Sequence, residues 1–150
     1  MRVLLVEDFD DKANDIQAFL GQEFPEFDVK RCKAYNSAQE TIFEGEENFD
    51  LILLDMSMTT FDLETDVSGG LPEPQAGRDL LEGMFLREIY TPVIVVTMYN
   101  VFGRKELSTF HKELLEDFPQ NYKDYVYYSA QHSDWKKELK NKINKILKWL

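Results

Sequence analysis

Three short runs of consecutive apolar residues stand out along the chain, at positions 3–6, 51–54 and 93–96. They are rich in Val, Ile and Leu, which is typical of strands that are buried on both faces of a parallel sheet. Two weaker runs, at 27–35 and 125–128, alternate or are aromatic, as edge strands do. The pattern therefore predicts five strands.

Segments with the spacing of amphipathic helices separate these runs. They cover about 11–21, 36–44, 78–90, 104–117 and 133–150. Strict alternation of strand and helix implies right-handed crossovers, and so predicts an α/β fold with a doubly wound parallel sheet. The flavodoxin-like strand order 2-1-3-4-5 is the common arrangement for five strands. We expect one domain over residues 1–150, because this length and a hydrophobic content of 43% suit a single core.

One segment, at about 56–76, has neither the helix nor the strand pattern. It is rich in Thr, Ser, Gly and Pro, with several acidic residues among them. A loop of this length is uncommon in a compact domain and usually is either functional or disordered. Both alternatives stay open, namely a loose lid and an ordered segment over a site.

The charge of the chain is unevenly distributed. Its net charge of −11 argues against general nucleic-acid binding, which needs clustered Lys and Arg. Six lysines against Glu138 give residues 136–150 a charge of +5, which leaves −16 on residues 1–135. The basic final helix is either a solvated face or a docking surface for an acidic partner.

No apolar run approaches the length that a bilayer span needs, and the N-terminus runs directly into an acidic turn. Cys32 is the single cysteine and cannot form an internal disulfide, in agreement with a reducing compartment. We expect a soluble, cytoplasmic protein in which Cys32 fills the core within a strand.

Acidic residues follow two of the predicted strands. Glu7 and Asp8 come after the first, Asp55 ends the third, and Thr97 ends the fourth. In the strand order 2-1-3-4-5 these strands are neighbours, so we expect their ends to meet at the sheet edge where α/β proteins bind ligands. Carboxylates with room for water suit Mg²⁺, which would offset the charge of an incoming phosphoryl group and leave Asp55 as a nucleophile. The plain alternative is a solvated acidic rim.

Three motifs together carry a family resemblance: Val3–Asp8, Asp50–Met58 and Pro92–Thr97. In this order, and over nearly the whole chain, they resemble the receiver domain of two-component response regulators, of which CheY-like proteins are examples. The resemblance implies a phosphoprotein in phosphorelay signal transduction. Its cofactor would be Mg²⁺, and its partners would be a sensor histidine kinase or phosphotransfer protein and an unknown downstream protein.

The resemblance also implies roles for individual residues. Glu7 and Asp8 would bind Mg²⁺ together with Asp55, the phosphoacceptor, and the backbone carbonyl of Ser57. Thr97 matches the switch hydroxyl that contacts the phosphoryl group. Two further positions match as well: the switch aromatic, Tyr125, and the glycine that opens the third helix, Gly77.

This chain departs from the family pattern at two places. The family has a Lys-Pro pair after the fifth strand, whose ammonium pairs with the phosphoryl oxygens, whereas this chain has Tyr128 and Ser129 there. A phenol brings no positive charge to the site. Arg104 or Lys105 could reach the site instead. The second departure is the 56–76 segment, which is longer than family members need and could shield Asp55.

These features leave three functions open. The first is a receiver that accepts a phosphoryl group on Asp55 and signals through protein contacts, with no enzyme activity beyond self-phosphorylation and autodephosphorylation. The second is a degenerate receiver that acts as an interaction module without phosphorylation, suggested by Tyr128 and the long loop.

The third is a phosphatase of the haloacid dehalogenase type, whose Asp-x-Asp-x-Thr motif is similar to Asp55-Met56-Ser57-Met58-Thr59. That family needs a second Asp as general acid, where this chain has Ser57. The sequence therefore favours a receiver. A receiver is compatible with a homodimer. We expect it to have neither a nucleic-acid partner nor a membrane partner.

Overall fold

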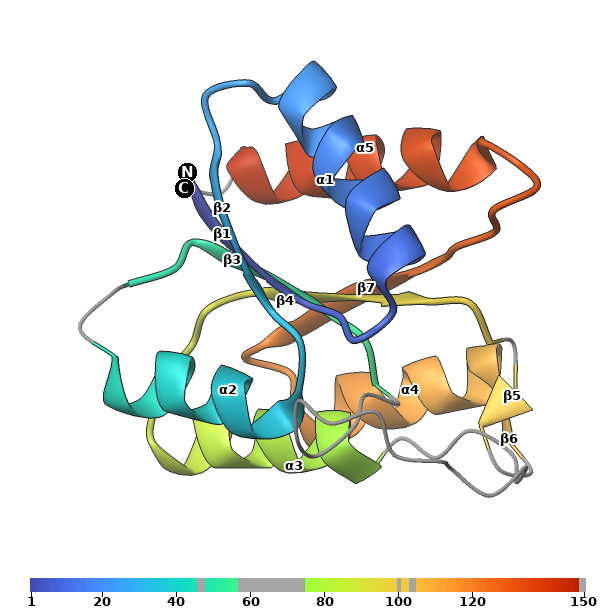
Figure 1. Cartoon of the computed structure of the whole chain (residues 1–150). Helices are drawn as coiled ribbons and strands as arrows, with labels where there is room; N and C mark the ends of the chain where they lie inside the picture. The colour runs from blue at the N-terminus through green and yellow to red at the C-terminus, as the bar shows by residue number, and fades with distance from the viewer. Residues whose placement is uncertain (46–47, 57–74, 100, 103–104, 149–150) are drawn as a thin grey trace.

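The computed structural model describes residues 1–45, 48–56, 75–99, 101–102 and 105–148. Its centre is a five-stranded parallel sheet of order β2-β1-β3-β4-β7 (Figure 1). The strands are β1 (Arg2–Val6), β2 (Asp28–Cys32), β3 (Leu51–Leu54), β4 (Val93–Thr97) and β7 (Tyr122–Tyr127). This confirms the predicted strand order 2-1-3-4-5.

Helices cover both faces of the sheet (Figure 1). One face carries α1 (Asp10–Glu23) and α5 (Asp134–Leu147). The other carries α2 (Tyr35–Gln39), which continues as the π-helical turn η1 (Glu40–Glu44), α3 (Gln75–Leu86) and α4 (Leu107–Asp117). Within the described residues, no helix is both long and apolar enough to cross a membrane.

Several helix boundaries differ from those predicted: α3 begins earlier, at Gln75, α5 ends at Leu147, and two further differences have a local cause. The α3 helix ends at Leu86, not at 90, and Glu88 has a left-handed φ of 56°, which an α-helix cannot continue through. The α4 helix begins at Leu107, not at 104, because β6 (Lys105–Glu106) pairs antiparallel with β5 (Val101–Phe102). Helical periodicity does not reveal either local interruption.

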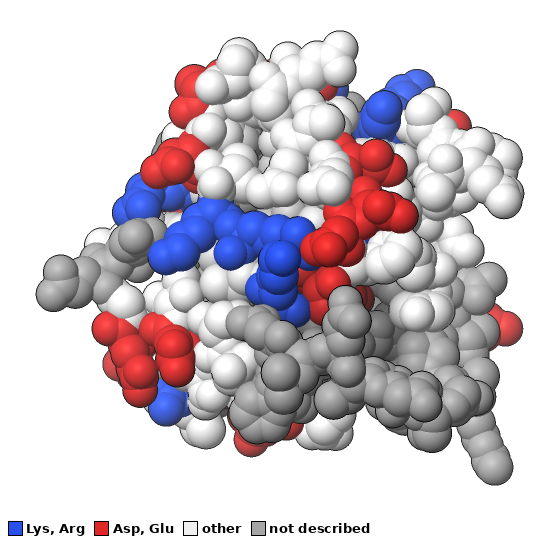
Figure 2. Space-filling view, in the orientation of Figure 1, with Lys and Arg blue, Asp and Glu red and all other residues white. Residues whose placement is uncertain are grey.

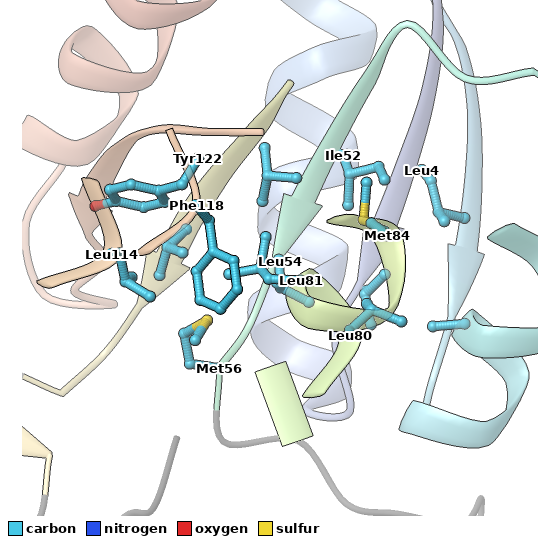
Figure 3. Packing of buried hydrophobic residues seen from close by; sticks show 14 of the residues in the cluster. Leu4, Ile52, Leu54, Met56, Leu80, Leu81, Met84, Leu114, Phe118 and Tyr122 are labelled. Atoms are coloured by element: carbon cyan, nitrogen blue, oxygen red, sulfur yellow. The ribbon is translucent and has the colours of Figure 1, made fainter. Parts of the chain in front are cut away.

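Alternate residues of the central strands fill two separate cores. Leu4, Ile52 and Leu54 face α3 and α4 and pack with Leu80 and Phe118 (Figure 3). The intervening strand residues face α1 and α5, where Trp135 is 3% exposed. Each such side chain contributes about 1.5–3 kcal/mol on full burial, which explains why these strands are apolar on both faces.

The strand register determines where the functional residues lie. Val6 pairs with Leu54, and Leu54 pairs with Val95, so the strand ends that follow lie next to one another. The Asp55 backbone N–H donates to the Val6 carbonyl at 3.0 Å, which extends the ladder one residue beyond β3. The fold therefore brings Glu7 and Asp55 to the same edge of the sheet.

Gly77, in the first turn of α3, packs against Met56, the residue that follows Asp55. Its backbone N–H donates to the Met56 carbonyl at 3.1 Å, and a Cβ added at Gly77 would lie 2.8 Å from the Met56 Cα. Only a residue without a side chain permits this approach. In contrast, a Cβ added at Gly21, within α1, would have no heavy atom within 4 Å.

We predict that Gly77→Ala lowers the free energy of unfolding by about 1–3 kcal/mol, because the added methyl group displaces Met56 in a packed core. Gly21→Ala is the matched control and should raise it by about 0.5–1 kcal/mol through helix propensity. Urea denaturation of both variants measures the difference. A Gly77→Ala protein as stable as wild type would contradict the packing described here.

His111 links α4 to the edge strand of the sheet. Its Nδ1 lies 2.6 Å from the Tyr122 hydroxyl, and its ring meets the Tyr125 ring at a centroid distance of 4.9 Å. Burial lowers the pKa of His111, Lys142 lowers it further, and Asp124 opposes both. The neutral imidazole is therefore the form that the fold favours.

We predict that His111 titrates below its ordinary pKa of 6.5, as followed by its ring proton resonances in NMR. The unfolded chain binds this proton more readily, so the contribution to stability is complete above pH 6.5 and is lost as the pH falls through the folded pKa. His111→Gln should reduce the loss of stability on acidification. A midpoint at or above 6.5 would contradict the prediction.

Candidate functional site

Three carboxylates converge at the carboxyl edge of the sheet. Glu7, Asp8 and Asp55 each offer an oxygen within 4.8 Å of the others. Glu7 and Asp55 are 2% and 6% exposed, while Asp8 is half-buried. The group borders a pocket of about 290 Å³, whose described lining residues are Glu7, Asp8, Phe9, Lys12, Asp55, Met98 and Tyr99. The predicted convergence of these three acids is thus present in the structure.

Burial raises the free energy of the charged carboxylates in this cluster. Removal of Glu7 from water, and secondly the charge of Asp55, raise the pKa of Glu7. Lys12 and a 3.2 Å hydrogen bond from the Phe9 backbone N–H act in the opposite direction. Three acids held this closely favour a bound cation, and their all-oxygen donor set fits Mg²⁺.

Lys12, on the first turn of α1, is the basic side chain at this cluster. Its ammonium is 1% exposed, lies 2.6 Å from Glu7 Oε1 and 4.0 Å from Asp55 Oδ1, and donates to the Val96 carbonyl at 2.6 Å. Sequence reasoning missed this residue. The available signal was its position on the buried stripe of α1, which consists of Lys12, Ala13, Ile16, Phe19 and Leu20.

Thr97 lies at the end of β4, as predicted, and is fully buried. Its hydroxyl accepts a 3.0 Å hydrogen bond from the Tyr99 backbone N–H, and Tyr99 lines the pocket. Its carbonyl accepts a 2.7 Å hydrogen bond from the Tyr128 backbone N–H. Thr97 therefore connects the edge of the pocket with the residue that follows β7.

Tyr125 is half-buried on the α4 side of β7, where its ring contacts His111. The Lys142 ammonium donates to the Tyr125 carbonyl and lies 5.1 Å from its ring centroid. Tyr125 is not among the described residues that line the pocket. The structure thus places it between the sheet edge and α4.

Tyr128 occupies the position where the family resemblance places a lysine. Its side chain is 2% exposed, packs 5.1 Å from the Trp135 ring, and donates its hydroxyl to Asp15 on α1. Burial, and then this hydrogen bond, raise the pKa of Tyr128, so the phenol stays neutral. Its hydroxyl is bonded to α1 and not to any of the three acids.

Several sequence predictions fall outside the residues that the structure describes. These are Ser57, Arg104 and all of the 56–76 segment between 57 and 74. Lys105 is described as part of the backbone pairing of β6. The proposals that concern these side chains therefore remain predictions from the sequence.

Comparison with known proteins gives a consistent result. No established family profile matches the chain. The Detocs response regulatory protein DtcB of Enterobacter cloacae is 30% identical over 97% of this chain and 100% of its own length. An uncharacterized protein of Sinorhizobium fredii, y4jR, is 28% identical over 94% of this chain and 95% of its own.

Solved structures with the same fold include receiver domains. The signal receiver domain of a Luxo repressor protein from Vibrio parahaemolyticus has a TM-score of 0.66 at 22% identity, over 98% of this chain and 89% of that one. A CheY-like receiver domain protein from Methanospirillum hungatei has a TM-score of 0.62 at 20% identity, over 99% and 98%. These likenesses support the fold, and the DtcB relative supports the family. The chain belongs to the response regulator receiver family.

Proposed function

We propose that this receiver accepts a phosphoryl group on Asp55, in a Mg²⁺-dependent reaction, from a sensor histidine kinase or a phosphotransfer protein. It then signals through protein contacts. One observation carries the proposal: Asp55 directly follows β3 and lies beside a pocket, with oxygens of Glu7 and Asp8 within 4.8 Å. The receiver fold and the DtcB relative support phosphorelay signalling in general.

The transfer is a displacement at phosphorus. A carboxylate oxygen of Asp55 forms the new O–P bond, the N–P bond of the donor phosphohistidine breaks, and the imidazole nitrogen keeps the electron pair. Glu7, Asp8 and Asp55 would hold Mg²⁺, with the Ser57 backbone carbonyl as the further ligand that the family resemblance implies. The metal would neutralise negative charge on the transferred oxygens.

The change at Asp55 would reach the surface through β4 and β7. In this proposal the Thr97 hydroxyl, which donates to the Tyr99 carbonyl at 3.5 Å, turns its O–H to donate to the phosphoryl group. Thr97 pairs with Tyr127 in the sheet, and Tyr125 lies two residues earlier on the same strand. The α4–β7 side, which includes His111, would then present a changed surface to a downstream partner.

The second candidate is a receiver that binds its partner without phosphorylation. The bond from the Tyr128 hydroxyl to Asp15 favours it, because this residue then supplies neither a charge nor a hydrogen bond to the acids. In either case we propose no enzyme activity beyond self-phosphorylation and autodephosphorylation, and a cytoplasmic location. Phosphorylation by a small donor distinguishes the two candidates.

We predict that the protein takes up one phosphoryl group from acetyl phosphate with Mg²⁺, as measured by intact mass, and that Asp55→Asn takes up none. The matched control is Asp50→Asn, because Asp50 lies at the opposite end of the same strand and its carboxylate accepts from the Arg2 backbone N–H at 2.8 Å. This control should be phosphorylated like wild type. If no Asp55-dependent phosphoprotein forms, with this donor or with a cognate kinase, the second candidate replaces the first.

We also predict that Glu7→Gln weakens Mg²⁺ binding by about tenfold or more, as measured by titration calorimetry, because the site loses a charged ligand. Glu26→Gln, which changes an exposed carboxylate, is the control and should bind Mg²⁺ like wild type. Equal affinity of the Glu7→Gln and wild-type proteins would remove Glu7 from the proposed ligand set.

A further inference from the structure

We propose that Lys12 replaces the lysine that the family places after β7, and that its ammonium contacts the phosphoryl oxygens on Asp55. The inference rests on the proposed function and assigns to it a residue outside the receiver motifs. It makes Lys12 a catalytic residue of the transfer reaction. The argument starts from the cost of burying this side chain.

An ammonium taken out of water without partners costs several kcal/mol, so a buried lysine needs a specific reason. Lys12 is 1% exposed, and its two contacts at 2.6 Å are with the Glu7 carboxylate and the Val96 carbonyl. The same nitrogen is 4.0 Å from Asp55 Oδ1. Glu7 follows β1, Asp55 follows β3 and Val96 belongs to β4, so Lys12 reaches the meeting point of three strand ends.

Phosphorylation would add charge at this point. Conversion of the Asp55 carboxylate to an acyl phosphate places further anionic oxygens in the pocket that Lys12 lines. With its nitrogen already 4.0 Å from the acceptor oxygen, the flexible side chain needs a small rotation to donate to them. The donor's leaving group keeps the electron pair of the broken bond, so Lys12 stabilises charge and transfers no proton.

The contact between Tyr128 and Asp15 agrees with a cation that comes from α1 and not from the residues after β7. Asp15 lies three residues after Lys12, nearly one turn further along the same helix. It accepts the Tyr128 hydroxyl, while the Tyr128 ring lies 6.0 Å from the Lys12 nitrogen. Within one turn of α1, Asp15 therefore binds the tyrosine at the family's lysine position, and Lys12 places its ammonium near Asp55.

Two nearby basic residues, Arg31 on β2 and Lys33 directly after it, are engaged elsewhere. Figure 2 shows basic side chains from β2 beside acidic side chains at the start of α1. Arg31 contacts Asp10 at 2.9 Å and donates to the Glu7 backbone carbonyl, and Lys33 lies 3.8 Å from Asp10. Among the described residues that line the pocket, Lys12 is the one cation.

The test compares the rate of phosphorylation by acetyl phosphate in four proteins. Lys12→Met should lower the rate about 10- to 100-fold, the size expected for one charge-assisted hydrogen bond. Lys12→Met with Tyr128→Lys restores a cation at the family position and should regain most of the loss. Lys137→Met, which removes an exposed lysine of α5, should match wild type.

A second measurement does not depend on the folding of any variant. With Mg²⁺ and beryllofluoride, a mimic of the phosphoryl group, NMR of the wild-type protein should show magnetisation transfer between the bound fluorines and the Lys12 side chain. Bound beryllofluoride without this contact overturns the proposal for Lys12. So does a Lys12→Met protein that folds and is phosphorylated at the wild-type rate.

These results separate the two proposals. If wild type is phosphorylated on Asp55 and Lys12→Met has the same rate, the proposed function stands and the proposed role of Lys12 is rejected. A wild-type protein that gains no more phosphoryl group than Asp55→Asn, and binds no beryllofluoride, rejects both. If Lys12 only neutralised Glu7 to stabilise the fold, Lys12→Met would alter the unfolding midpoint, and Tyr128→Lys would restore no rate.

Discussion

The site of this protein depends on the close approach of buried carboxylates at the ends of β1 and β3. The parallel register places Val6 beside Leu54, so the residues that follow, Glu7 and Asp55, meet in a place with little water. Like charges in such a place repel each other strongly unless a cation lies between or beside them. The ion pair from Lys12 to Glu7, at 2.6 Å, supplies one positive charge from within the chain.

That requirement gives α1 two roles. Its apolar stripe packs against one face of the sheet, and Lys12 extends the same stripe to the site. Since its ammonium contacts both a carboxylate and the Val96 carbonyl, the helix is tied to β1 and β4 together. A change in charge at Asp55 would therefore act on the start of α1 as well as on the end of β4, and this would give the proposed switch a second route from the site to the surface.

The sequence predicts the sheet well because its signal is local. Runs such as Val93–Thr97 are apolar on both faces, and a parallel sheet between two helix layers is the structure that buries both. The same reasoning predicts that Glu7, Asp8 and Asp55 meet, since carboxyl ends of neighbouring parallel strands share an edge. It does not assign Lys12 to the site, because its position on the apolar stripe of α1 is a weak signal for a lysine, which ordinarily extends its charged end to solvent. Its burial depends on tertiary contacts with Glu7 and Val96.

Tyr128 shows why the absence of a motif lysine is a weak guide to the absence of a positive charge. From the sequence alone, the loss of a lysine after β7 suggests a site without a cation. In the folded protein the tyrosine ring fills space beside Trp135, its hydroxyl engages Asp15, and an ammonium from another element lies 4.0 Å from Asp55. Electrostatics favours a positive charge near Asp55 but does not determine which helix or strand supplies it. In this structure the motif lysine is absent and a cation still lies beside Asp55, because α1 buries Lys12 there.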